Sequence, residues 1–256
     1  MNIFLGEPPA NIKQWIIDHY TPPTPPASGP LCFTAEQDGS SVSLVGYDND
    51  MFEQIDIFAS LQCSTDNSTW QEWDGHVINL NAGQKVYIKA LNPNPNGMAK
   101  DYGMKYHNFI FEGKIAASGN IQYLLEDTGS RTDVPAYAYY DLFDSAIVLT
   151  QAPALPATTL ADYCYYSMFD NCTSLTQAPA LPATTLANGC YESMFNNCTS
   201  LTQAPTLPAT TLARSCYYNM FYGCSKFSEC HMKASMEGVY NTSTHGDTKK
   251  TVVYDL

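Results

Sequence analysis

Apolar and polar positions recur with a period of 26 residues through the C-terminal half of the chain. Three tandem copies begin at Leu149, Leu175 and Leu201, and the first copy reads LTQAPALPATTLADYCYYSMFDNCTS. A weaker copy precedes them and contains the stretch AYYDLFDSA. A fixed period of this size predicts stacked supersecondary units, each of which contacts only its neighbours and buries its apolar face against them.

Each copy contains a segment whose apolar spacing predicts a short amphipathic helix. In the first copy these apolar residues are Cys164, Tyr165, Met168, Phe169 and Cys172. Their intervals place them on one helical face, which would point into the stack. The residues that differ between copies fall on the opposite face, where drift under a packing constraint accounts for the variation without any ligand.

The stretch SLTQAPAL after each predicted helix predicts a short parallel strand stacked on its copies. Inward positions would be Leu149, Ala152 and Ala154, whereas Thr150, Gln151 and Pro153 would face solvent. Because proline donates no hydrogen bond to a ladder, each rung must be short. The outward polar positions form a candidate binding ladder: Thr150, Gln151, Thr176, Gln177, Thr202 and Gln203. Such a ladder either binds an extended ligand or serves solubility and bonding along the stack.

The central part of the chain, residues 31–130, has short alternating runs divided by Gly, Asn, Asp and Pro. Runs such as SVSLVGY and KVYIKAL predict strands of an antiparallel β-sandwich. Three aromatic residues in this part, Trp73, Tyr102 and Tyr106, form a candidate platform for sugars. Because sandwich cores use the same residue types, core packing is the alternative for all three.

The N-terminal 20 residues contain one amphipathic helix candidate from Pro9 to Tyr20, followed by the proline-rich stretch TPPTPPASGP. Its apolar residues Ile12, Trp15 and Ile16 form a candidate anchor. An isolated helix this short needs a surface to pack against, and the prolines favour an extended, semi-rigid tether. Either the helix docks onto a larger assembly or it folds back on its own domain.

Six of the nine cysteines occupy two fixed places in the repeat. One period before Cys164 and Cys172, the weaker copy has Ala138 and Ala146. Since alanine fills a core position but cannot cross-link, the repeat cysteines are predicted to be buried thiols in a dry core and not a ladder of disulfides.

The charge balance of the chain excludes several partners. With 25 acidic and 12 basic residues, the net charge is −13. No basic stripe exists to displace counterions from nucleic acid, and no apolar run reaches the length of a membrane span. The start MNIFLGEPPA lacks the basic and apolar regions of a secretory signal peptide, so we expect cytoplasmic synthesis without secretory export. No catalytic, phosphate-binding or metal-binding motif is present, so neither an enzyme nor a cofactor is predicted.

The repeat pattern LPATTLADYCYYSMFDNCTSLTQAPALP, with Met-Phe-x-x-Cys-x-x-Leu in register, resembles BspA-like leucine-rich repeats over residues 134–227. This resemblance implies units of strand, proline turn and short helix. It also implies a non-enzymatic surface protein of gut and oral anaerobes or of their phages, linked to adhesion to host proteins, glycans or cells.

Together these patterns predict an α+β multidomain chain. Its predicted parts are an anchor helix (1–20), a proline linker (21–30), a β-sandwich (31–130), a leucine-rich-repeat solenoid (131–230) and a C-terminal cap (231–256). The function that we expect is a displayed binding module on a virion appendage that contacts a host surface protein or glycan. A cell-surface adhesin is the first alternative, and an accessory domain of a carbohydrate-active enzyme is the second. Residues 1–20 would contact a virion scaffold protein, and a homo-oligomer is compatible with this setting.

Overall fold

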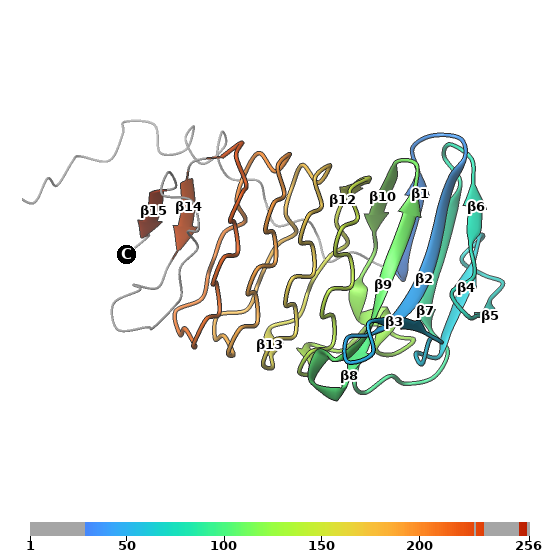
Figure 1. Cartoon of the computed structure of the whole chain (residues 1–256), viewed down its shortest axis with the longest axis horizontal. Coiled ribbons are helices and arrows are strands. Elements are labelled where there is room, and N and C mark those ends of the chain that lie inside the picture. The colour runs from blue at the N-terminus through green and yellow to red at the C-terminus, as the bar shows by residue number, and fades with distance from the viewer. Residues whose placement is uncertain (1–28, 228, 233–250, 255–256) are drawn as a thin grey trace, which may run out of the picture.

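The computed structural model describes residues 29–227, 229–232 and 251–254. The predicted anchor helix with Ile12, Trp15 and Ile16, and most of the proline linker, lie outside the described residues. Two packed sheets form one end of the molecule, and the repeats stack away from them as successive coils (Figure 1).

The first sheet has the strand order β12-β10-β1-β7-β4-β5. Its strands are β1 (Leu31–Ala35), β4 (Leu61–Ser64), β5 (Gln71–Trp73), β7 (Lys85–Ala90), β10 (Ile115–Ser118) and β12 (Leu149–Gln151). All pairs within it are antiparallel except β10 with β12, which is parallel. The parallel strand β12 belongs to the first full repeat, so the repeats continue this sheet.

The second sheet has the order β3-β2-β9-β8, and β6 also pairs with β2. Its strands are β2 (Ser40–Asp48), β3 (Glu53–Ile55), β6 (Ile78–Leu80), β8 (Ala99–Lys100) and β9 (Lys105–Glu112). The two sheets face each other, and the ring of Phe33 in the first lies 4.9 Å from that of Phe109 in the second. Alternating apolar residues therefore form strands here because one face of each sheet is buried against the other.

The predicted α+β class is wrong, because the described part of the chain is nearly all β. Strands make up 30% of it, and no helix reaches seven residues. Its helical elements are two single turns of 3-10 helix, η1 (Asp101–Gly103) and η2 (Ile121–Leu124). None of the described helices has the length and apolar character of a membrane span.

The segment predicted to be a helix in each repeat is instead a row of consecutive four-residue turns. The turn segments cover residues 137–146, 163–172, 189–198 and 215–224, and they define coils 1 to 4. Within a segment, alternate N–H groups bond three residues back, as Tyr166 N does to Tyr163 O at 3.2 Å. Every fourth residue has a positive φ, for example Ser167 (47°) and Asn171 (56°), which a right-handed helix does not allow.

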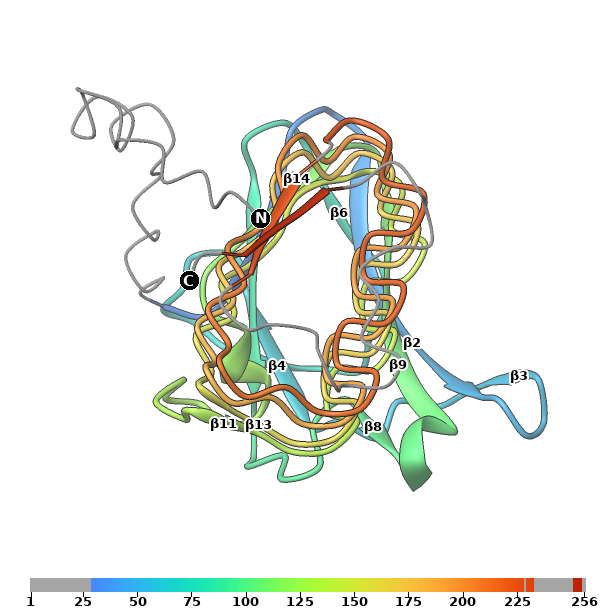
Figure 2. The ribbon, with the colours of Figure 1, turned by 90° about the vertical axis from the view of Figure 1, so that its left-hand side faces the viewer.

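The remaining N–H groups of each turn segment join it to the next coil. Tyr165 N donates to Cys190 O at 3.1 Å, and Tyr191 N donates to Cys216 O at 3.0 Å. Fifteen such bonds, 2.7 to 3.1 Å long, form five columns, and every one runs from a coil to the carbonyl of the following coil. The coils therefore overlie one another when viewed along the stack (Figure 2).

The predicted parallel ladder through SLTQAPAL is also largely absent, so the leucine-rich-repeat solenoid is wrong as a description of these coils. Only the first full copy forms a strand there, β12. The later copies are joined by isolated backbone hydrogen bonds, such as the one from Thr202 N to Thr176 O at 3.2 Å. Pro153, predicted to face solvent, is buried. Two short parallel pairs complete the described strands: β11 (Asp133–Val134) with β13 (Thr159–Leu160), and β14 (Glu229–Met232) with β15 (Thr251–Tyr254).

Two columns of aromatic rings fill the core of the stack. One consists of Tyr139, Tyr165, Tyr191 and Tyr217, and the other of Phe143, Phe169, Phe195 and Phe221, with centroid spacings of 5.3 to 5.9 Å. The phenylalanine column continues through Phe109 to Trp73 in the sheets. A single hydrophobic core thus runs from the sheets into the coils.

The six repeat cysteines line this core as predicted. All nine cysteines of the chain are buried, and none is in a disulfide. At the second repeat position the thiol points at a carbonyl of the preceding coil, as in Cys172 Sγ to Phe143 O at 3.1 Å. Burial raises the pKa of these thiols, so they stay protonated.

Candidate functional site

Seven partly exposed tyrosines form one continuous surface where the sheets meet coils 1 and 2. We call this group the tyrosine surface, and its members are Tyr47, Tyr102, Tyr106, Tyr137, Tyr140, Tyr163 and Tyr166. Neighbouring rings in it have centroids 4.7 to 6.4 Å apart. Tyr102 is the most exposed, at 83%.

Strand pairing and turn geometry bring these residues together. Tyr47 and Tyr106 are direct partners in the β2–β9 pair, and their rings stack at 5.5 Å. Tyr140 follows beside Tyr106, with centroids 5.6 Å apart. Gly103, at the end of η1, lies against the rings of Tyr137 and Tyr140, where a Cβ would approach Tyr140 to 2.9 Å. The absence of a side chain at Gly103 therefore lets η1 pack on the coil.

The stacking of the coils does not require tyrosine at these positions. One repeat further on, the equivalents of Tyr163 and Tyr166 are Gly189 and Glu192. Tyr163 also has a positive φ of 56°, which a bulky side chain adopts at a cost of roughly 1–2 kcal/mol. Backbone strain at a bulky residue, at a position where another copy has glycine, is typical of a binding site.

A hollow of about 290 Å³, the junction pocket, adjoins the tyrosine surface. It lies between the outer side of β9 and the end of the coil 1 turn segment, and Tyr47 and Tyr106 belong to both the surface and the pocket. The other lining residues are Asn108, Phe109, Ile110, Phe111, Asp144, Ser145, Ala146 and Ile147. Ile147 is 56% exposed at its rim. The pocket is therefore made from two segments remote in sequence, and each half alone lacks it.

Asn108 lines this pocket and joins its two sides. Its side chain is 6% exposed, and its Nδ2 donates to the backbone carbonyl of Asp144 at 3.1 Å. That bond fixes the orientation of the amide. Within the described part of the chain, Oδ1 accepts no hydrogen bond. A buried acceptor without a donor is unfavourable, but Oδ1 has almost no accessible surface, so Asn108 acts here mainly by fixing the pocket wall to coil 1.

Three carboxyl groups beside the pocket hold their protons more tightly than usual. Burial, together with the neighbouring Asp144 and Asp170, raises the pKa of Asp141 to about 8. Burial and then Asp144 raise the pKa of Asp170 to about 6, and burial raises the pKa of Asp144. Perturbed carboxyl groups beside a hollow mark a candidate functional site.

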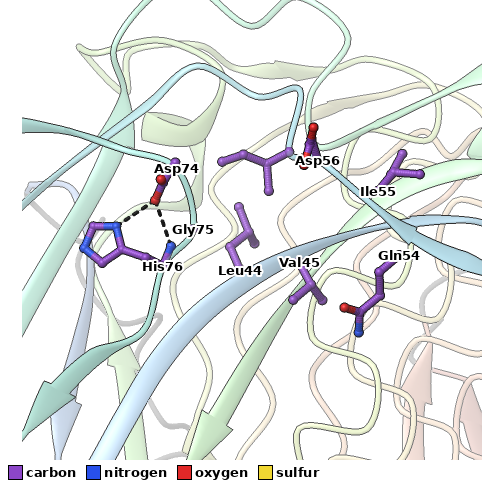
Figure 3. A pocket seen from close by; sticks show the side chains of 9 residues that line it. Leu44, Val45, Gln54, Ile55, Asp56, Asp74, Gly75 and His76 are labelled. Carbon is purple, nitrogen blue, oxygen red and sulfur yellow. Dashed lines mark hydrogen bonds and ion pairs between the residues drawn. The ribbon is translucent and has the colours of Figure 1, made fainter.

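A second hollow of about 270 Å³ lies on the other side of β2 (Figure 3). A hydrogen bond of 2.7 Å joins Asp74 Oδ1 and His76 Nδ1 there. This pair is exposed, and the imidazole points away from Asp56 and Gln54 at the opposite rim (Figure 3). The polar groups do not converge on one point, so the junction pocket is the stronger candidate.

The three predicted platform residues do not form one platform. Trp73 is 2% exposed, its ring stacks on Phe109, and its indole N–H donates to His76 O at 2.9 Å. Tyr102 and Tyr106 both lie on the tyrosine surface but are connected only through Tyr137 and Tyr140.

The threonine and glutamine ladder forms a separate stripe. Five of its residues are exposed: Gln151, Thr176, Gln177, Thr202 and Gln203. Thr150 is partly buried, and its hydroxyl donates to Glu36 Oε2 at 3.0 Å and to Ile115 O at 3.2 Å. Among the described residues, no recorded contact joins this stripe to the tyrosine surface, and no group of three His, Cys, Asp or Glu side chains is placed to hold a metal.

Sequence reasoning missed five members of the tyrosine surface. Tyr163 and Tyr166 were placed on an outward face but attributed to drift, and Tyr47, Tyr137 and Tyr140 were not singled out. One available signal was that coils 1 and 2 have tyrosine at the same two repeat positions, as Tyr137 with Tyr163 and as Tyr140 with Tyr166. Comparison with known proteins adds no further assignment, since no protein-family model, curated protein or solved structure matches the chain.

Proposed function

We propose that the chain is a binding module without catalysis, and that its ligand is a glycan that lies across the tyrosine surface. The observation that carries this proposal is the unbroken run of seven partly exposed tyrosines across the junction. Sugar rings stack their C–H faces on aromatic rings, and tyrosine supplies such area at low conformational cost.

Acceptors beside the rings support a ligand rich in hydroxyl groups. The carboxyl groups of Asp141 and Asp144 lie at one end of the surface, and Glu192 continues it on coil 3. A small number of fixed polar groups within an aromatic site gives orientation and specificity. With a net charge of −13, the chain would bind neutral or positively charged glycans better than sulfated or phosphorylated ones.

The setting that we propose is display on a virion appendage, and a cell-surface adhesin is the alternative. This part rests on the sequence resemblance of the repeats and on the N-terminal segment. Neighbouring genes for tail or capsid proteins would support the virion, whereas surface labelling of intact cells would support the adhesin.

A glycan array probed with the full chain tests the ligand class. The full chain is required because both the tyrosine surface and the junction pocket span the sheets and the coils. We expect selective binding to a neutral or amino-containing glycan, with no release of reducing ends during incubation. Release of reducing ends would show that the chain hydrolyses glycans and would contradict a module without catalysis. Binding to surface proteins with no binding to glycans would contradict the proposed ligand class.

A matched pair of variants tests whether glycan binding depends on the tyrosine surface. Tyr163→Ser introduces the residue that coil 4 has at the equivalent position, Ser215, with a similar φ of 55°, so folding is preserved. Tyr222→Ser removes a tyrosine that is 46% exposed on coil 4 and outside the surface. Loss of glycan binding in Tyr163→Ser and its retention in Tyr222→Ser are the expected results.

A further inference from the structure

The junction pocket has a more specific chemistry than the rest of the tyrosine surface, and the following inference rests on the proposed function. Apart from its two tyrosines, the ionisable side chain that lines the pocket is that of Asp144. Asn108 is held to the coil through its Nδ2 and Asp144 O, and its Oδ1 is buried. Ser145 Oγ donates to Asp144 Oδ1 at 3.3 Å, so this hydroxyl is not a free donor. The residues that line the pocket include no lysine or arginine.

The direction of the bonds between coils adds negative potential at the pocket. All fifteen bonds of the five columns point their carbonyls toward the sheets. Aligned peptide groups act as a dipole whose carbonyl end is negative, as at the C-terminus of a helix. In three columns the last carbonyl, on coil 1, accepts a hydrogen bond from the sheet end of the molecule, donated by Met98 N, Phe109 N or Asn108 Nδ2. The carbonyl of Tyr140, in another column, has no recorded donor in the described part of the chain.

The aromatic side of the pocket also favours a cation. Tyr47 and Tyr106 stack at 5.5 Å, and both line the pocket. A cation over a tyrosine face is attracted by the ring quadrupole, and the attraction increases when water is excluded. Asp144 supplies the carboxylate for a charge-assisted hydrogen bond with the same group.

From these features we infer that the junction pocket is an ammonium subsite that binds the free amino group of an amino sugar in the bound glycan. The ammonium group donates to the Asp144 carboxylate and lies against the ring of Tyr106. An acetylated amine loses the charge and two donors. A neutral hydroxyl at that position keeps one donor but loses the charge.

Titration of the full chain with three oligosaccharides of equal length tests this subsite. The probes are β-1,4-linked oligomers of glucosamine, of N-acetylglucosamine and of glucose, at about pH 6, where a sugar amine is protonated. We expect the glucosamine oligomer to bind about tenfold more tightly than the other two, because a hydrogen bond to a charged group contributes more than a neutral one.

The variant Asp144→Asn should remove this preference, and Asp170→Asn is its matched control. Asp144, Asp170 and Asn196 occupy the same repeat position, so asparagine is compatible with the coil, and each variant replaces one carboxyl group by a neutral amide. Asp170 does not line the pocket. Preference lost in Asp144→Asn and kept in Asp170→Asn supports the subsite.

Equal affinity of the wild-type chain for all three oligomers would overturn the ammonium subsite and leave glycan binding intact. Unchanged preference in Asp144→Asn would overturn it as well. If none of the three oligomers binds and the array shows no other glycan ligand, both the subsite and the proposed function fail.

Discussion

The side-chain amide of Asn108, on β9, caps the coil carbonyl of Asp144 at 3.1 Å. The two residues lie 36 positions apart and belong to the sheets and to coil 1. Through this bond and that of Phe109 N to Leu142 O at 2.9 Å, the edge of β9 terminates two of the five columns of the stack. The sheets are thus the cap that an open stack of repeats requires.

Removal of the Asn108 side-chain amide from this cap should destabilise the folded chain. We expect Asn108→Ala to lower the free energy of unfolding by about 1–3 kcal/mol, because it leaves a buried carbonyl without a donor. Urea denaturation measures this change. Asn96→Ala, at an exposed position, should change stability by less than about 0.5 kcal/mol. Equal effects of the two substitutions would show that the cap is unimportant.

Addition of a ring to coil 3 should extend the tyrosine surface. Glu192 occupies the repeat position of Tyr166 and Tyr218, and Tyr140 and Tyr166 already stack at 4.7 Å. Glu192→Tyr should stabilise the fold by about 1 kcal/mol, because the new ring lies between Tyr166 and Tyr218 and can stack on both. It should also tighten the binding of oligosaccharides long enough to reach coil 3, as measured by calorimetric titration. Weaker binding of long oligosaccharides would contradict a ligand path along the coils.

The partly buried carboxyl groups of Asp141 and Asp170 should make the folded state less stable as pH rises. Asp141 keeps its proton to about pH 8 and Asp170 to about pH 6, against an ordinary pKa of 3.8. Between pH 3.8 and these values the folded state binds more protons than the unfolded chain. The free energy of unfolding contributed by these groups therefore falls from about pH 4 to about pH 8.

Asp141→Asn should remove most of this dependence. Asn219 has the same repeat position and the same φ of 52°, so the backbone accepts asparagine. We expect a gain of at least about 1 kcal/mol at pH 8 and little change below pH 4, from denaturation at a series of pH values. A parallel shift at every pH would contradict the assignment to Asp141.

Thiol reactivity should follow burial. Because all nine cysteines are buried without disulfides, a thiol reagent should react slowly with the folded chain and titrate nine thiols after unfolding without reductant. Reductant should not change the melting temperature. Fewer than nine thiols in the unfolded, unreduced chain would reveal a disulfide.

The repeat period and the buried cysteines could be predicted from the sequence because they depend on identical residues recurring in register. The helix could not, because the apolar positions of Cys164, Met168 and Cys172 repeat at intervals of four. Over nine residues this pattern matches both a helix and a row of four-residue turns. The signal for turns was that serine, asparagine or glycine occupies nine of the twelve positions, four residues apart within each segment, at which φ is positive.

The candidate site could be predicted only in part, because it depends on contacts between distant segments. Tyr106 was identified from its own surroundings in the sequence. Its partners Tyr47 and Tyr140 are brought to it by the β2–β9 register and by the docking of coil 1. Neither relationship follows from local periodicity. For Trp73 the sequence left both a sugar platform and core packing open, and the structure places its ring in the core against Phe109.

The most direct test of a glycan site across the junction is calorimetric titration of Tyr106→Ala and Tyr166→Ala with the preferred oligosaccharide of the wild-type chain. Tyr106 lies on the sheets and Tyr166 on coil 2, so one ligand across the junction loses a stacked ring in either variant. The account predicts that each variant weakens binding at least about fivefold, since a stacked ring contributes about 1 kcal/mol or more, while Tyr222→Ala binds as the wild type does. Binding unaffected by one or both of the first two substitutions would contradict it.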